Sequence, residues 1–230
     1  MLKINDIHST VFRIDHLSIG YGGQPLVRDI SFELAPGECV LLAGPNGSGK
    51  TTLLKALTLT DSSPSKASVL LIPTNIPKVK GFTVEAFVRT GCYRESDWMG
   101  RVSKETERRM DEALRLLGID GLKGRDISSL SDGEFQKACL ATGLTRKADV
   151  LLLDEPTAHL DVENRIDVLR TLHDVARRSG TAILFSSHDL HDALQVADRV
   201  FALSREGRFI ASDDKETVLK EAFPDFFAYL

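Results

Sequence analysis

The 230-residue sequence is poor in cysteine and has no long apolar run, and both features exclude classes of protein. Its three cysteines, Cys39, Cys92 and Cys139, are far apart and include no CxxC pair. We therefore expect reduced, buried thiols rather than a zinc site or a disulfide scaffold. No apolar run approaches the roughly 20 residues of a membrane-spanning helix, and residues 1–10 lack the apolar stretch of a signal peptide. These features predict a cytoplasmic protein that reaches a membrane only through a partner.

A strong charge imbalance is also missing. The formal net charge is −4, which gives no overall attraction to nucleic acid or to anionic lipid. Hydrophobic residues make up 42% and charged residues 27% of the chain, as in an ordinary globular protein. A chain of this length buries roughly 70–75% of its surface on folding and needs no metal or disulfide to hold its core. We expect a single domain over residues 1–230 and no nucleic-acid partner.

Short apolar runs alternate with helical patterns along most of the chain. The expected strands are Val11–Ile19, Ile30–Leu34, Cys39–Ala43, Ser68–Ile72, Val150–Leu153 and Ala182–Phe185, and the expected helices follow Gly49 and Asp132 and cover Thr83–Gly91, Lys104–Leu117 and Val162–Arg178. This alternation predicts an α/β fold, with a mainly parallel sheet covered on both faces and an N-terminal antiparallel β part. Residues from about 76 to 145 are helical and interrupt the alternation. We expect them to form an inserted helical subdomain, with the core made of residues from about 1 to 75 and 146 to 230.

A glycine-rich segment follows the expected strand Cys39–Ala43 and opens a helix. It matches the P-loop (Walker A) pattern G-x-x-x-x-G-K-[ST] and consists of Gly44, Pro45, Asn46, Gly47, Ser48, Gly49, Lys50 and Thr51, with Thr52 directly after it. Glycines let backbone N–H groups converge on phosphate oxygens beside the positive end of a helix. Lys50 adds a cation for the β- and γ-phosphates, and the Thr51 hydroxyl can coordinate Mg²⁺. The alternative, a plain glycine-rich turn, is disfavoured by the strand–helix context.

Two acids end the apolar strand Val150–Leu153. Asp154 and Glu155 are expected at the carboxyl edge of the sheet, where open α/β sheets bind ligands. Asp154 suits the Mg²⁺ shell, and Glu155 suits a general base or a group that orients the attacking water. In the plain alternative, the two acids only solvate the end of a strand.

The segment Leu130-Ser131-Asp132-Gly133-Glu134 lies at the start of an expected helix. Read alone, it is an ordinary helix cap. Together with the two motifs above, and in this order, it resembles the signature peptide of ABC ATPases, which many members write L-S-G-G-Q. The resemblance covers essentially the whole chain and implies a P-loop NTPase of ABC type. It also implies that Ser131, Asp132, Gly133 and Glu134 reach the γ-phosphate of ATP held by a second subunit, which suits the free N–H groups of a helix start.

Three further residues match the family pattern. Tyr21 resembles the aromatic residue that stacks on adenine, although a surface tyrosine on a strand would have the same sequence context. Asp161, after Leu160, resembles the loop residue that crosses the dimer interface. His188 resembles the switch histidine that contacts the γ-phosphate, and its plain alternative is a cap at a strand end. The resemblance therefore assigns catalysis to Glu155, His188 and Lys50, with ATP and Mg²⁺ as ligands.

The sequence also departs from the family. Where members usually carry a glutamine that senses Mg²⁺ and the transport partner, this chain has Thr74, followed by Asn75. Neither side chain has the reach of glutamine, so Thr74 is a candidate metal residue only through a water or a shift of the loop. Glu134 in place of glutamine is a milder change. The stretch from Lys50 to Thr74 is also shorter than usual, and this departure and that at Thr74 leave hydrolysis in place but put the usual coupling geometry in doubt.

The resemblance implies an ATPase subunit that works as a homodimer, or beside a paired ATPase subunit, on transmembrane permease subunits at the inner face of the cell membrane. The sequence of residues 130–134, with Phe82–Val88 upstream, is similar to the corresponding sequences of ATPases of importers for iron-siderophores, haem and cobalamin. The alternative is a soluble ABC ATPase in cofactor assembly or regulation. A phosphate-loop kinase or GTPase is disfavoured by the signature peptide, and the chain lacks the N-K-x-D motif of GTPases.

Two segments are candidates for contact with a partner. Thr74–Arg101 carries few acids and one tryptophan, Trp98, which is a possible apolar anchor. Its basic residues are Lys78, Lys80, Arg89, Arg94 and Arg101. The plain reading of these charges is a solvated face. The aromatic run Glu221–Leu230 could pack on the domain or contact a partner.

Overall fold

The computed structural model describes residues 10–60, 67–99, 101–158 and 160–224. Its strands are β1 (Phe12–Tyr21), β2 (Gln24–Leu34), β3 (Cys39–Ala43), β4 (Val69–Ile72), β5 (Val150–Leu153), β6 (Ala182–Ser187), β7 (Arg199–Leu203) and β8 (Phe209–Ser212). Its α-helices are α1 (Lys50–Leu57), α2 (Val84–Arg89), α3 (Lys104–Leu116), α4 (Asp132–Thr145), α5 (Val162–Ser179), α6 (Leu190–Val196) and α7 (Lys215–Ala222). Short 3-10 helices cover Thr90–Glu95 (η1), Asp120–Leu122 (η2) and Ile127–Ser129 (η3).

The central sheet has the strand order β4-β5-β6-β3-β7-β8, and all its neighbouring strands are parallel except β7 and β8. Every residue of β3, β5 and β6 is buried. Alternate residues of these strands enter two separate apolar clusters, because successive side chains of a strand point to opposite faces. Strands buried on both faces are typical of parallel sheets covered by helices.

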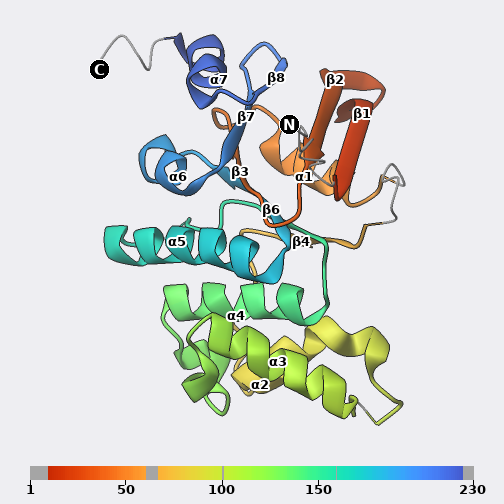
Figure 1. Ribbon diagram of the computed structural model, residues 1–230, viewed down its shortest axis with the longest axis vertical. Helices are drawn as coiled ribbons and strands as arrows, with labels where there is room; N and C mark the ends of the chain where they lie inside the picture. The colour runs from red at the N-terminus through yellow and green to blue at the C-terminus, as the bar shows by residue number, and fades with distance from the viewer. Residues whose placement is uncertain (1–9, 61–66, 100, 159, 225–230) are drawn as a thin grey trace, which may run out of the picture.

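The antiparallel pair β1–β2 forms a second sheet beside α1, at the upper right of Figure 1. Its turn consists of Gly22 and Gly23, both with positive φ, as a tight two-residue hairpin requires. The fold class predicted from the sequence, a mainly parallel sheet with an N-terminal antiparallel part and added helices, is confirmed.

The helices α2, α3 and α4 lie between β4 and β5 in the chain and form the lower part of the molecule in Figure 1. Helix α4 lies between α3 and α5, and it is buried at four successive positions, Ala138 to Ala141. A helix that is buried on several sides has no single polar face. Helix α4 therefore packs between the lower helices on one side and helix α5 and the sheet on the other.

Several boundaries differ from the sequence-based expectation. Strand β2 begins at Gln24 rather than at the expected Ile30. The sequence analysis missed its first residues because they are mostly exposed on the hairpin and lack an apolar pattern. The expected helix Thr83–Gly91 is divided into α2 and η1, and Thr83 is the N-cap of α2. The elements β7, β8, α6 and α7 were not predicted.

The prediction of buried cysteines can be compared with the structure, whereas most of the C-terminal aromatic run cannot. All three cysteines are buried, and burial raises the pKa of Cys39 and raises that of Cys139 to about 12, so neither thiol is reactive. Of the aromatic run near the C-terminus, Phe223 packs against the core, and residues 225–230 lie outside the described part of the chain.

Among the described helices, none combines the length and the apolar character needed to cross a membrane.

Gly91 in η1 packs closely against α4, so a larger residue at this position is expected to destabilise the fold. A Cβ added at Gly91 would lie 2.3 Å from the carbonyl oxygen of Thr142. We expect Gly91→Ala to destabilise the fold by about 1–3 kcal/mol, because backbone must shift to relieve the overlap. For a chain of this size that lowers the melting temperature by roughly 3–10 °C in a thermal scan followed by circular dichroism. Gly124→Ala is the matched control, since its Cβ would meet no atom within 4 Å, and equal melting temperatures would contradict this packing argument.

Candidate nucleotide site

The loop between β3 and α1 has a shape that only glycine allows at two positions. Gly49 caps α1 with φ 101° in the left-handed region, and a Cβ there would lie 2.7 Å from Leu26. A Cβ on Gly44 would lie 2.6 Å from the Ser48 hydroxyl and 2.9 Å from the Leu203 carbonyl oxygen. The segment predicted to be a phosphate loop therefore forms a tight turn at the N-terminus of a helix, and helix N-termini favour anions.

Lys50 closes this loop from within. Its Nζ donates to the carbonyl oxygens of Gly44 at 2.7 Å and Pro45 at 3.2 Å. Burial lowers the pKa of Lys50, and the carboxylates of Glu155 and Asp154 oppose that shift. The ammonium group therefore lies inside the loop, in reach of the acids that follow β5.

Ser48 provides a test of whether the loop fits a phosphate. Its hydroxyl oxygen is buried and, within the described residues, has no hydrogen-bond partner. A buried polar atom without a partner costs about 1–3 kcal/mol, which a ligand oxygen can recover. Because Ser48 lies within the loop that Lys50 closes, the residues present fit a phosphate group.

Asp154 is held by contacts from three directions. Its Oδ2 accepts from the Thr51 hydroxyl at 2.8 Å and its Oδ1 from the Ser186 hydroxyl at 2.9 Å. The Thr74 hydroxyl donates to the main-chain oxygen of Asp154 at 2.8 Å. A hydroxyl and a carboxylate are oxygen ligands of the kind Mg²⁺ uses when phosphates and water complete its shell. The protein side of such a site would be Thr51 and Asp154, whose side chains are already in contact.

Glu155 has an unusual backbone for a residue that is not glycine. Its φ of 46° is in the left-handed region, which costs roughly 1–2 kcal/mol. Its N–H donates to the Ser186 hydroxyl at 2.9 Å, and its Oε2 lies 3.2 Å from His188 Nδ1. The structure thus brings together the acid and the histidine that the sequence singled out separately, at the end of β5 and just after β6.

Ser186 is a residue of this candidate site that the sequence analysis missed. It is fully buried in β6, where it contacts both Asp154 and Glu155. One signal was present, because two serines close a strand that is otherwise apolar from Ala182 to Phe185. Buried hydroxyls need partners, and the carboxyl end of the neighbouring strand is where these partners lie.

Tyr21 lies beside the phosphate loop. Its side chain is 70% exposed, and its hydroxyl is 2.7 Å from the hydroxyl of Thr52 in α1. An exposed ring anchored at one end leaves a face free for stacking on a base. The structure therefore places Tyr21 at the same edge of the molecule as the predicted phosphate loop.

The predicted signature residues form a second group. Ser131 is the N-cap of α4 in a capping box, with its hydroxyl accepting from Glu134 N–H and its own N–H donating to the Glu134 carboxylate. Gly133 packs against Asn164, and Asn164 also bonds to both carboxylate oxygens of Asp161, the N-cap of α5. No hydrogen bond among the described residues joins this group to the phosphate loop of the same chain.

Comparison with protein-family models matches residues 27–158 to the model described as "ABC transporter". Among curated relatives, the zinc import ATP-binding protein ZnuC of Jannaschia sp. (strain CCS1) is 35% identical over 205 residues, covering 85% of this chain and 79% of the relative. The achromobactin transport ATP-binding protein CbrD of Dickeya dadantii is 32% identical, covering 90% of this chain and 83% of the relative. The ferric enterobactin transport ATP-binding protein FepC of Escherichia coli K12 is 31% identical, covering 91% and 84%.

Solved structures agree on the fold. One is of an inward-facing ABC transporter described as of the metal-chelate type, with a TM-score of 0.83, 23% identity and coverage of 95% of this chain and 89% of that one. Another is a nucleotide-free ATP-binding cassette from an ABC transporter, with a TM-score of 0.79, 18% identity and coverage of 94% and 96%. At these identities the likeness concerns the fold alone.

Proposed function

This chain belongs to the ABC transporter family, whose ATP-binding subunits hydrolyse ATP to drive transport, and from this premise we propose that it energises import of a metal chelate. One observation carries the ATPase part of this proposal. A phosphate loop closed by Lys50 lies beside two acids, one bonded to Thr51 and the other to His188. These residues match, position by position, the chemistry needed to hold and cleave a terminal phosphate.

In the proposed mechanism, the phosphate loop and Lys50 bind the phosphates, and Tyr21 stacks on the base. Glu155 orients a water and accepts its proton while the water oxygen attacks the γ-phosphorus and the bond to the ADP oxygen breaks. His188, next to Glu155, contacts the γ-phosphate. Mg²⁺, when held by Thr51 and Asp154, neutralises phosphate charge. Positioning and electrostatic stabilisation supply most of the catalysis of such a transfer.

The proposed active unit has two copies of the cassette, or this chain and a paired subunit. Gly133 of the signature group packs against Asn164, which bonds to Asp161, and this arrangement supports a site that meets the phosphate of a second molecule. ATP then lies between Lys50 of one copy and Ser131 of the other, and hydrolysis lets the two copies part. Residues from about 76 to 145 would move as a helical subdomain during this cycle.

We place the protein in the cytoplasm, on the inner face of the membrane, through permease subunits. Two of the relatives are transport proteins for achromobactin and ferric enterobactin and support a metal-chelate cargo, whereas the third is named for zinc import. An iron-siderophore is the preferred cargo, with haem and cobalamin as members of the same class of large metal chelates.

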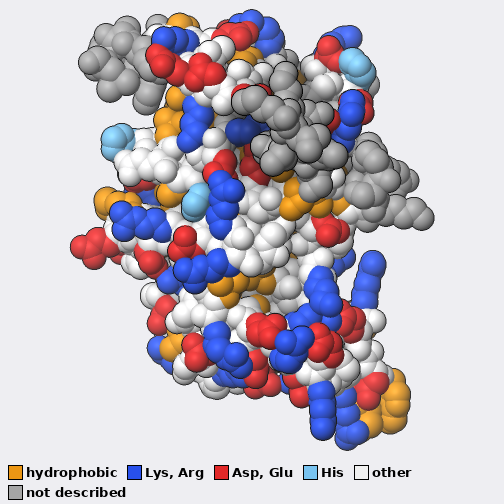
Figure 2. Space-filling model, viewed as in Figure 1, with side chains coloured by type: hydrophobic (Ala, Val, Ile, Leu, Met, Phe, Trp, Pro, Cys, Tyr) orange, Lys and Arg blue, Asp and Glu red, His pale blue; other side chains and the backbone are white. Residues whose placement is uncertain are grey.

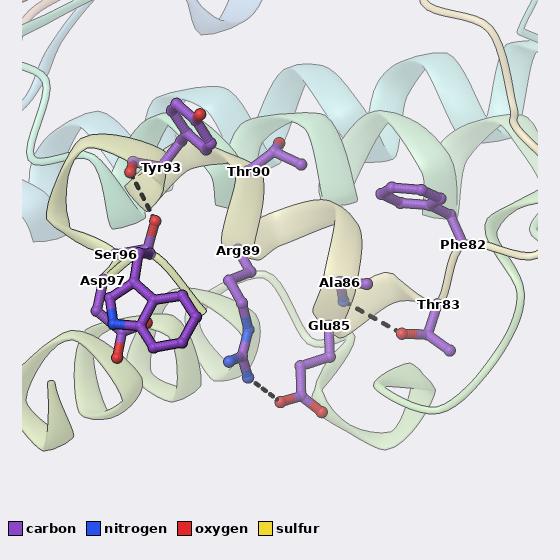
Figure 3. A pocket seen from close by; sticks show the side chains of 10 residues that line it. Phe82, Thr83, Glu85, Ala86, Arg89, Thr90, Tyr93, Ser96 and Asp97 are labelled. Carbon is purple, nitrogen blue, oxygen red and sulfur yellow. Dashed lines mark hydrogen bonds and ion pairs between the residues drawn. The ribbon is translucent and has the colours of Figure 1, made fainter. Parts of the chain in front are cut away.

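A groove in the helical part of the chain is the proposed docking surface for the permease. It encloses about 690 Å³ along α2 and η1, and Figure 3 shows the side chains that line it. Tyr93 and Trp98 at the groove are 80% and 91% exposed, and exposed aromatic residues of this size are typical anchors of interfaces.

Two of the five basic residues that the sequence analysis named in this segment are already paired with acids. Arg89 is paired with Glu85, as the dashed line in Figure 3 marks, and Lys78 is paired with Asp132. Figure 2 shows Lys and Arg side chains mixed with acids over the lower, helical part of this face. We therefore expect the aromatic residues, more than net charge, to hold the permease.

Co-purification from the membrane fraction tests this proposal. The tagged wild-type chain is expected to retain transmembrane permease subunits, and the Trp98→Ala/Lys80→Glu variant is expected to retain at least about tenfold less, because a central aromatic anchor contributes about 2 kcal/mol or more. Mass spectrometry of the retained proteins measures both. Leu59→Ala is the control, since Leu59 is equally exposed at 84% but follows α1.

Retention of no transmembrane protein by the wild type would favour the alternative, an ABC ATPase in cofactor assembly. Full retention by the double variant would move the docking surface away from Trp98.

A further inference from the structure

Lys78 joins the loop after β4 to the signature segment through three contacts. Its Nζ donates to the Leu130 carbonyl oxygen at 2.8 Å and lies 2.6 Å from the Asp132 carboxylate. It also lies 5.4 Å from the centre of the Phe135 ring. The side chain of Lys78 is 26% exposed, so its stem is largely packed while its charge is directed at residues 130–135.

The start of α4 carries two acids, Asp132 and Glu134, whose negative charges would oppose binding of a phosphate there. Glu134 is held in the capping box, where its contact with the Ser131 N–H lowers its pKa, and Arg125 lies 3.9 Å from it. Asp132 is 64% exposed and takes the place of the uncharged glycine in the L-S-G-G-Q form of the peptide. A carboxylate at this position repels a phosphate, and Lys78 is its cationic partner.

The same loop is attached at its other end to the acids of the nucleotide site. Thr74, four residues before Lys78, donates its hydroxyl to the main-chain oxygen of Asp154. A cavity of about 410 Å³ between these two attachments is lined by both residues and by Asp132, Phe135 and Leu160. The loop therefore links the chain's own nucleotide site to the segment that would meet the nucleotide of a second copy.

We propose that Lys78 is a positioning residue for the signature segment: it neutralises Asp132 and holds the Leu130 carbonyl group so that the start of α4 can accept a terminal phosphate. This inference rests on the proposed function, because only a second copy brings a phosphate to Ser131. The expected consequence is specific to the ATP-bound dimer. In the monomer, a partly exposed ion pair contributes little to stability.

The test uses the Glu155→Gln protein as parent, since slow turnover keeps ATP bound, and measures dimerisation with Mg-ATP by analytical ultracentrifugation. We expect Lys78→Met to weaken dimerisation at least about tenfold, because an unpaired like charge then faces the phosphate in both sites of the dimer. Methionine keeps the apolar stem over Phe135, so the fold is retained. Binding of a fluorescent ATP analogue to the monomer is expected to stay unchanged.

A second substitution separates charge from packing. Asp132→Asn, added to Lys78→Met, is expected to restore dimerisation to within about threefold of the parent, because it removes the carboxylate that lacks a partner. Lys123→Met is the matched control. It removes an ion pair of the same kind, with Asp111 on α3, and is expected to dimerise like the parent.

Each outcome decides one point. Dimerisation of Lys78→Met equal to that of the parent would overturn the inference and leave the proposed function intact. Failure of Asp132→Asn to restore a weakened dimer would overturn charge neutralisation as the role of Lys78. A parent that stays monomeric with Mg-ATP would instead refute the two-copy mechanism itself.

Discussion

Glu155→Gln is expected to lower ATP turnover by at least about a hundredfold while ATP binding is retained, because a general base contributes 10²–10⁴ to the rate. Glutamine has the shape of glutamate but cannot accept a proton from the attacking water. The contacts that position residue 155 survive the change, since its N–H still donates to Ser186 and its side chain can still reach His188. The loss should therefore appear in kcat and not in the binding of ATP.

The same variant is expected to accumulate as an ATP-dependent dimer. In the proposed mechanism, hydrolysis of ATP lets the two copies separate. Slow hydrolysis therefore keeps ATP between Lys50 of one copy and Ser131 of the other, and the dimer is expected to outlast a gel-filtration run. Phosphate release measures the first effect, and gel filtration with and without Mg-ATP measures the second. Glu112→Gln on α3 is the control, because Glu112 is an exposed glutamate paired with Arg108 and takes no part in the site.

Near-normal turnover by Glu155→Gln would remove Glu155 from its proposed role. Slow turnover without any dimer, at high protein concentration and with the permease present, would keep that role and refute the two-copy mechanism.

The parts of this molecule that the sequence predicted well are those fixed by local chemistry. Part of the demand for glycine in the phosphate loop is local, since Gly49 has a φ of 101° and a Cβ on Gly44 would meet the Ser48 hydroxyl four residues on, so the pattern is visible in a single segment. The buried strands β3, β5 and β6 are apolar at nearly every position, which predicts a parallel sheet without knowledge of the strand order.

The missed features depend on residues that are far apart in sequence. Ser186 meets Asp154 only because β6 pairs with β5 in a register that places Phe185 beside Leu153. Lys78 meets Asp132 only after the loop beyond β4 folds onto α4. The two serines at the end of an otherwise apolar strand are a local signal for the first contact, and the second contact has no local pattern. The division of the expected helix Thr83–Gly91 has a similar origin, since Gly91 packs on the carbonyl of Thr142 in another helix.

Ser186→Ala is expected to cause the largest combined loss of stability and activity, because one buried hydroxyl serves two groups. Removal leaves Asp154 Oδ1 without its donor and the Glu155 N–H without its acceptor. Each buried group left unpaired costs about 1–3 kcal/mol, so a loss of about 2–6 kcal/mol is expected for the two groups together. In a chain of this size that lowers the melting temperature by roughly 4–24 °C.

The effect on activity separates a positioning role from a structural one. Glu155 is held in a left-handed conformation, and Ser186 accepts the hydrogen bond from its N–H. We expect Ser186→Ala to lower kcat by about tenfold or more at a temperature well below its melting point, since a misplaced base loses much of its contribution, while KM for ATP changes little. Ser186→Thr keeps the hydroxyl and should recover most of the kcat.

Ser187→Ala is the matched control. Ser187 is the next residue of β6 and is also buried, at 4% exposure, but within the described part of the chain its hydroxyl bonds only to the main chain of Asp189. It should lose some stability and keep its kcat. If Ser186→Ala lost stability with kcat unchanged, Ser186 would hold the strand ends together without setting the geometry of Glu155, and the strained conformation of that glutamate would need another source of support.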